Sequence, residues 1–133
     1  MYIPLDFDSG VPIFRQIELA IRRFVASGRL KAGEQVPSVR DLCAELRVNP
    51  ATVNRAFREL ELAGYVETRR GLGTFVAARP PRPSPLDAEE MLASRLDSII
   101  SDASLLGLSP EDLARMITRR ALREPASGRN HGG

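Results

Sequence analysis

The stretch VPSVRDLCAELRVNPATVNRAFRELELAG, residues 36–64, contains two helix-start signals a short distance apart. Ser38 is a typical N-cap and precedes apolar residues at helical spacing, Val39, Leu42, Cys43 and Leu46. Asn49 followed by Pro50 is an N-cap with proline at the first helical position, and this second helix runs to about residue 63 before Gly64 ends it. Two short helices joined by a tight turn predict a helix-turn-helix.

The second helix of this motif has an apolar face and a polar face. The apolar stripe consists of Val53, Ala56, Phe57 and Leu60, and the opposite face carries Pro50, Ala51, Asn54, Arg55 and Arg58. In a helix-turn-helix the N-terminal end of this helix contacts base edges in the major groove. Asn54 can pair with adenine, Arg55 can bind guanine or phosphate, and the helix N-terminal amides suit a phosphate. The alternative interpretation is an ordinary solvated helix face.

A β-hairpin is predicted directly after the second helix. Residues 65–68 and 74–77 alternate as short strands around the tip Arg69-Arg70-Gly71-Leu72-Gly73. Glycines allow the backbone to approach a groove closely, and arginines suit a narrow, electronegative minor groove. A plain turn is the alternative. A helix-turn-helix and a basic hairpin in series indicate a winged DNA-binding domain more specifically than either does alone.

The segments before the motif complete this domain, which we predict to span residues 1–78. Residues 1–11 are expected to form a strand or an extended arm, and Pro12 opens a helix that Gly28 ends. Residues 30–35 are predicted to form a turn.

Residues 79–85, RPPRPSP, are predicted to be an extended linker because four prolines in seven residues prevent a continuous helix or sheet. Residues 86–124 are predicted to form two helices separated at Gly107, with Ser109 and Pro110 starting the last one. Their apolar residues are expected to mediate dimerisation: Leu92, Leu96, Ile99, Ile100, Ala103, Leu113 and Ile117. The alternative is a two-helix hairpin packed on its own winged domain. Residues 125–133 are predicted to be a disordered tail.

The expected fold is therefore mostly α with a small β-hairpin, namely an N-terminal winged helix-turn-helix followed by a two-helix dimerisation segment. Basic charge is concentrated in its DNA-binding part: residues 12–79 carry twelve basic and seven acidic side chains, although the net charge of the whole chain is only +2. Of the nineteen basic residues eighteen are arginines, which can bind phosphates and guanine edges in a bidentate manner. A GC-rich genome would produce the same arginine bias.

Composition excludes several other classes of function. One cysteine, Cys43 within a helical pattern, and one histidine, His131 in the tail, exclude a His- or Cys-based metal site. The sequence also has no Gly-rich phosphate loop of the right spacing, so neither an enzyme nor a cofactor is expected. No segment is apolar enough to span a membrane, and the N-terminus has no signal pattern. We expect a cytoplasmic, nucleoid-associated protein. The runner-up is an adaptor that binds protein or RNA, and the lack of exposed stacking aromatics argues against RNA.

The motifs resemble those of the GntR family of bacterial repressors. The resemblance covers roughly residues 11–78 and rests on Pro12-Ile13-Phe14-Arg15-Gln16-Ile17, Val36-Pro37-Ser38-x-Arg40-x-Leu42, Val48-Asn49-x-x-Thr52-Val53 with Gly64-Tyr65-Val66, and Gly71-x-Gly73-Thr74-Phe75-Val76. The short C-terminal part is similar to that of the YtrA-like subgroup. Many relatives have an arginine or another polar residue where this chain has Pro50, so their operator sequences do not transfer to it.

The resemblance implies a regulator that binds double-stranded, pseudo-palindromic operator DNA as a homodimer. It implies repression, with its own operon or a transporter operon as the target. Arg40 would contact phosphate or base, and the other candidate DNA contacts are Ser38, Asn49, Pro50, Thr52, Asn54, Arg55, Arg69, Arg70 and Gly71. About 40 residues after the linker are too few for a metabolite pocket within one chain, so an unidentified small-molecule effector would need the dimer interface.

Overall fold

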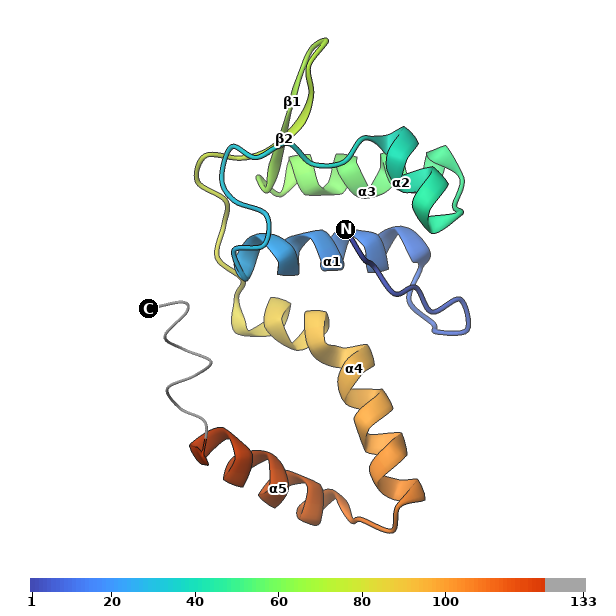
Figure 1. Cartoon of the computed structure of the whole chain (residues 1–133), viewed down its shortest axis with the longest axis vertical. Coiled ribbons are helices and arrows are strands. Elements are labelled where there is room, and N and C mark those ends of the chain that lie inside the picture. The colour runs from blue at the N-terminus through green and yellow to red at the C-terminus, as the bar shows by residue number, and fades with distance from the viewer. Residues whose placement is uncertain (124–133) are drawn as a thin grey trace. The chain divides into compact units, whose positions relative to one another are not determined.

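The computed structural model describes residues 1–123, which form five helices and one two-stranded sheet (Figure 1). The elements are α1 (Ile13–Ala26), α2 (Val39–Leu46), α3 (Pro50–Leu62), β1 (Val66–Arg69), β2 (Gly73–Val76), α4 (Pro85–Leu105) and α5 (Pro110–Arg123). The prediction of a mostly helical fold with a small hairpin is confirmed. The chain divides into two compact units: the first is Met1–Met91 and the second starts at Leu92. The tail predicted for residues 125–133 lies outside the described residues.

The two helix starts of the helix-turn-helix are capped as the sequence predicts. The Ser38 hydroxyl accepts a hydrogen bond from the backbone N–H of Asp41 at 3.0 Å, which starts α2. The Asn49 side-chain oxygen accepts from the N–H groups of Ala51 at 2.7 Å and Thr52 at 3.4 Å, which starts α3. Between the helices Arg47 adopts φ = 58°, a left-handed conformation that reverses the chain quickly enough for α3 to begin three residues later.

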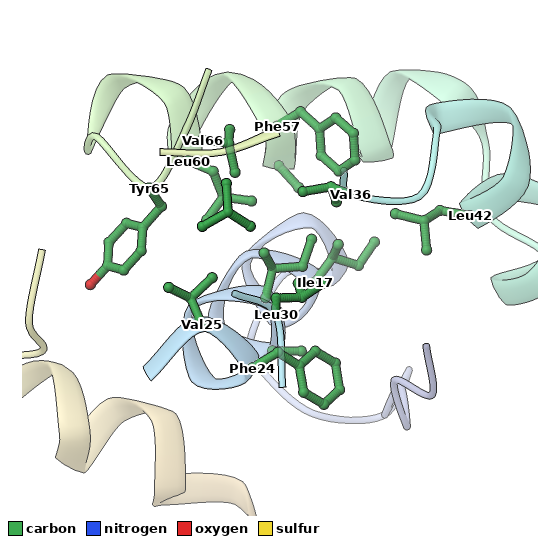
Figure 2. Packing of buried hydrophobic residues seen from close by; sticks show 14 of the residues in the cluster. Ile17, Phe24, Val25, Leu30, Val36, Leu42, Phe57, Leu60, Tyr65 and Val66 are labelled. Carbon is green, nitrogen blue, oxygen red and sulfur yellow. The ribbon is translucent and has the colours of Figure 1, made fainter. Parts of the chain in front are cut away.

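The core of the first unit lies between α1 and α3, which pack directly on each other (Figure 2). The predicted apolar stripe of α3 is confirmed as fully buried or nearly so. It shares one buried cluster with Ile17, Ile21 and Phe24 of α1. Leu42 of α2 lies at one end of this cluster (Figure 2). Burying a large aliphatic side chain contributes about 1.5–3 kcal/mol, so this interface fixes the position of α3.

The hairpin is a regular antiparallel ladder in which Val66 pairs with Val76 and Arg69 pairs with Gly73. Each strand is shifted by about one residue from the prediction. β1 covers residues 66–69 instead of 65–68, and β2 covers residues 73–76 instead of 74–77. Residues 34–36, which include the end of the turn predicted at residues 30–35, pair with β2 as well. The Val36 N–H donates to the Thr74 carbonyl and the Val76 N–H donates to the Glu34 carbonyl, both at 2.8 Å. These bonds anchor the base of the hairpin, which projects beyond α2 and α3 (Figure 1).

Residues 1–11 were predicted to be a strand or an extended arm, and the strand alternative is wrong. Ile3 is buried in the core, but the segment is irregular and bends at residues 7–11. The side chain of Gln16 takes the place of a strand partner. Its amide donates to the carbonyls of Asp6 at 2.8 Å and Val11 at 2.9 Å, and its oxygen accepts from the Asp6 N–H at 2.8 Å. Backbone groups satisfied by one side chain do not need a neighbouring strand.

The predicted linker is one residue too long, because Pro85 is the first residue of α4. Ser84 and Asp87 form a reciprocal cap: the Asp87 N–H donates to the Ser84 hydroxyl and the Ser84 N–H donates to the Asp87 carboxylate, each at 3.1 Å. Proline suits a first helical turn, where its missing N–H would have no intrahelical partner. In the second unit, Gly107 ends α4 with φ = 83°, as predicted.

A cluster of charged residues joins α1 to the first two turns of α4 inside the first unit. Glu18 is only 2% exposed and accepts from Arg15 at 2.8 Å and Arg22 at 2.5 Å. Arg15 also donates to the Glu90 carboxylate through two nitrogens, at 2.9 and 2.5 Å, and these hydrogen bonds to Glu90 raise the pKa of Arg15. Asp87 lies 4.0 Å from Arg22. The buried carboxylate is therefore paired on both sides, which offsets its desolvation.

Candidate nucleic-acid interface

The outer face of α3 is open to solvent at its N-terminal end. Pro50, Ala51, Asn54, Arg55 and Arg58 are all exposed, and the predicted separation of this face from the buried stripe is confirmed. Thr52 is half-buried beside them. A small, polar and cationic helix face of this kind can approach the edges of bases closely.

The first turn of α3 differs from the expectation that its amides bind a phosphate. Pro50 has no N–H, and the N–H groups of Ala51 and Thr52 already donate to the side chain of Asn49. The carboxamide N–H₂ of Asn49 makes no hydrogen bond within residues 1–123. Asn49 therefore combines two properties: it caps the helix with its oxygen and presents two donors at the helix tip.

Two candidate residues lie at the start of α2. Arg40 is exposed, and its side chain forms no ion pair with a carboxylate in the part of the chain that the structure describes. Ser38 uses its oxygen as the cap and keeps its hydroxyl proton as a donor. In the helix-turn-helix arrangement the first helix crosses the DNA backbone, which is the position that suits a phosphate contact.

Arg55 does not extend freely from α3. Its guanidinium carbon lies 3.9 Å from the centroid of the Phe14 ring, in the first turn of α1. Both side chains line a surface hollow of about 280 Å³ with Ile13, Asn49, Ala51 and Thr52. No acidic side chain lines this hollow, so the local field favours an anion.

The two arginines of the wing tip differ in their contacts. Arg69 forms an ion pair with Glu67 at 3.0 Å and lies over the ring of Phe75 at 4.2 Å, so it is engaged within the hairpin. Arg70 and Gly71 lie in the exposed turn beyond the last strand pair, and Gly71 has φ = 77°. Arg70, rather than Arg69, is the cation that the wing tip presents.

Gln35 holds the other side of the wing tip. Its side-chain amide donates to the carbonyl of Leu72 at 3.0 Å. Gly73 has φ = 123°, and a Cβ atom there would lie 2.6 Å from the Gln35 amide nitrogen. The tip is thus braced from residues outside the hairpin. The sequence patterns do not reveal the roles of Gln35 and Phe14, because each acts through a partner that no helical or strand period connects to it. Glu67 was also missed, although it lies two residues from Arg69 on the same face of β1, a spacing that could have revealed the pair.

The second unit presents an open apolar surface on α4 and α5. Leu92, Leu96, Ile99, Ile100 and Ile117 are exposed, between 39% and 50%, and Leu113 is half-buried. Ala103 differs from the expectation, because it is already buried within the chain and adds little to this surface. Exposed apolar residues of this size on α4 and α5 favour an interaction surface.

Residues 1–123 contain neither a cluster of metal ligands nor a membrane-spanning helix. No group of three or more His, Cys, Asp or Glu side chains in this range could hold a metal ion. None of the helices formed by these residues is long and apolar enough to cross a bilayer.

The chain is similar to known proteins in both its sequence and its fold. The model of the gntR family of bacterial regulatory proteins matches residues 14–76. The HTH-type transcriptional repressor YtrA of Bacillus subtilis (strain 168) is 34% identical over 115 residues, which cover 86% of this chain and 88% of that protein.

Two solved structures resemble the chain. YtrA from Sulfolobus acidocaldarius, a GntR-family transcription factor, aligns with a TM-score of 0.56 and 30% identity over 77% of this chain and 97% of that one. The DNA-binding domain of AraR in complex with operator ORR3 aligns with a TM-score of 0.50 and 25% identity over 58% and 93%.

The resemblance expected from the motifs is thereby confirmed over most of the chain. The family match spans α1 to β2, which includes the helix-turn-helix and the wing. The alignment with Bacillus YtrA extends over most of both chains, including the part that follows the wing. The chain belongs to the GntR family of bacterial regulatory proteins, among its short YtrA-like members, and is a DNA-binding transcriptional regulator rather than an enzyme.

Proposed function

We propose that the chain is a homodimeric repressor that binds a pseudo-palindromic operator in double-stranded DNA, with α3 in the major groove and the wing tip at the adjacent minor groove. The observation that carries this proposal is the exposed N-terminal end of α3 beside a hollow that no acidic side chain lines, together with exposed Arg40 at the start of α2 and exposed Arg70 at the wing tip. Two comparisons support it: the AraR domain is solved with operator DNA, and the Bacillus relative is a transcriptional repressor. Such a regulator acts in the cytoplasm, on nucleoid DNA.

The candidate residues divide by the kind of DNA contact they suit. Asn54 is exposed near the helix tip without a protein hydrogen bond among the described residues, which suits a bidentate contact to adenine. Arg40 suits a phosphate, and Arg70 a narrow minor groove. The remaining candidates allow close approach or add short-range hydrogen bonds: Ser38, Asn49, Pro50, Thr52 and Gly71.

The dimer is proposed from the apolar surface of the second unit. Leu92, Leu96, Ile99 and Ile100 are at spacings that place them along one side of α4, and Ile117 adds to them from α5. A second copy of the chain would cover these side chains by two-fold symmetry and would bring a second α3 to the other half-site. The target, following the family resemblance, is the chain's own operon or a transporter operon.

Selection of operators from a random duplex pool tests the DNA-binding part of the proposal. Wild type should recover an inverted repeat, and its affinity should fall by about a thousandfold between 50 and 200 mM salt, as expected for several phosphate contacts per subunit. Asn54→Ala should blur one base position in each half-site, whereas Arg40→Ala should weaken all sequences alike and reduce the salt dependence. A salt-insensitive affinity, or a preference for single strands, would contradict the proposal.

A further inference from the structure

The contact between Arg55 and Phe14 is unusually close. At 3.9 Å between guanidinium carbon and ring centroid, it is shorter than the other four arginine–ring distances found in residues 1–123, which run from 4.2 to 5.8 Å. The two residues come from different helices of the core, α1 and α3. A cation at this distance is held by the electron-rich face of the ring.

Arg55 differs from the other closely packed arginines in having no carboxylate partner. Arg15, Arg22 and Arg69 each form an ion pair. Within the described residues Arg55 forms none, although it is exposed on α3. Stacking uses only the face of a guanidinium, so the N–H donors around its edge remain free for another group.

The surroundings of Arg55 favour an anion as that other group. The hollow of about 280 Å³ beside it is lined by the first turn of α3 and by Ile13 and Phe14, without an acidic side chain. The first-turn amides of α3 are already bound by Asn49, so Arg55 is the cation available to an anion in this hollow. Because Arg55 is held against α1, it suits the edge of the groove better than the bases at its floor.

We propose that Phe14 is a positioning residue for DNA binding: its ring holds the Arg55 side chain so that the guanidinium grips a backbone phosphate beside α3. This inference rests on the proposed placement of α3 in the major groove. An arginine already ordered before binding loses less rotational freedom when it meets a phosphate. Phe14 thereby contributes to affinity without touching DNA, and Arg55 contributes to affinity rather than to base preference.

The test uses four variants of the full chain, Phe14→Leu, Phe14→Tyr, Arg55→Gln and the double variant Phe14→Leu/Arg55→Gln. Leucine keeps apolar volume against the core but removes the ring face, whereas tyrosine keeps the ring. Arg82→Gln, in the exposed linker, controls for the loss of one positive charge. Affinity is measured between 50 and 200 mM salt on the duplex selected with wild type and on a scrambled duplex, and circular dichroism checks that each variant is folded.

Arg55→Gln should weaken binding to both duplexes alike and reduce the slope of log affinity against log salt by about one. Phe14→Leu should weaken binding about three- to fivefold, in line with the strength of an exposed cation–π contact. Phe14→Tyr should stay within twofold of wild type, and the double variant should be no weaker than Arg55→Gln. That lack of additivity is the result a merely structural Phe14 would not give.

Three results would overturn the inference while DNA binding stands: wild-type affinity in folded Phe14→Leu, full additivity in the double variant, or a changed sequence preference in Arg55→Gln. If the wild-type protein does not prefer duplex DNA over single strands, or if its affinity does not change with salt concentration, the proposed function is overturned and this inference with it. The wild-type titration alone distinguishes that case from the other three.

Discussion

Replacing Gly73 by alanine should loosen the wing through two separable effects. Gly73 has φ = 123°, which L residues rarely adopt, and forcing alanine into such a conformation costs about 1–3 kcal/mol. The added Cβ would also lie 2.6 Å from the Gln35 amide nitrogen, so Gln35 must release the Leu72 carbonyl. This exposed hydrogen bond contributes about 0.5–1.5 kcal/mol, so the free energy of unfolding should fall by about 1.5–4.5 kcal/mol in total.

Urea unfolding at one fixed protein concentration measures this change, and two further variants separate its parts. Gly71→Ala is the matched control, because Gly71 has φ = 77° and nothing within 4 Å of the Cβ position. It should show backbone strain alone. In a Gln35→Ala background the substitution of Gly73 should cost less than in wild type, by about the value of the lost hydrogen bond.

Gln35 has no bracing role if Gly73→Ala proves no more destabilising than Gly71→Ala and loses the same stability with and without Gln35. Equal losses in both backgrounds would mean that Gln35 does not brace the tip. The expected result ties the wing to residues 34–36 through the side chain of Gln35 as well as through the backbone bonds to β2.

Three further predictions concern charge and assembly. Glu67→Gln should release Arg69 from its ion pair and tighten duplex binding about two- to fivefold in a fluorescence titration at low salt, and unchanged or weaker binding would contradict the role given to that pair. A chain ending after Met91, the end of the first unit, should be a monomer by light scattering, and a full dimer would show that the apolar surface of the second unit is not the interface. The Ser84 N–H donates to the Asp87 carboxylate and lowers the pKa of Asp87 below its ordinary value. The cap therefore stabilises the fold fully when the pH is above the ordinary pKa of an aspartate, and this stabilisation is lost as the pH falls through the lowered pKa. Between about pH 5 and about pH 2 the urea midpoint of wild type should therefore fall more than that of Asp87→Asn, and parallel curves would argue against the cap.

The parts of the fold that were predicted from sequence are those with local causes. Ser38, Asn49 and Gly107 act on backbone groups within a few residues, and the apolar stripe of α3 follows the helical period. Two capped helices in series likewise predicted the helix-turn-helix, and two alternating strands around a Gly-rich tip predicted the wing. These signals are readable because each is contained in a short window.

The parts that were missed depend on contacts between distant segments. Gln16 replaces a strand partner for the N-terminal arm, Gln35 reaches the wing, and Glu18 lies at the centre of a charged cluster that extends to α4. Arg55 was correctly placed on the outer face of α3, but its stacking on Phe14 depends on how α1 and α3 pack. Polar side chains at single positions carry no periodic signal, so their partners emerge only from the folded arrangement.

The charged cluster around Glu18 also bears on how winged domains of this kind can be exchanged between proteins. Arg15 and Arg22 are matched by Glu18 together with Glu90 and Asp87, and the last two lie beyond the proline-rich linker. A gene fusion joined within that linker would carry both arginines to the new protein and leave two of their three carboxylates behind. A transferable module of this type therefore extends through the first two turns of α4, and a fusion made earlier has to supply new acidic partners for α1.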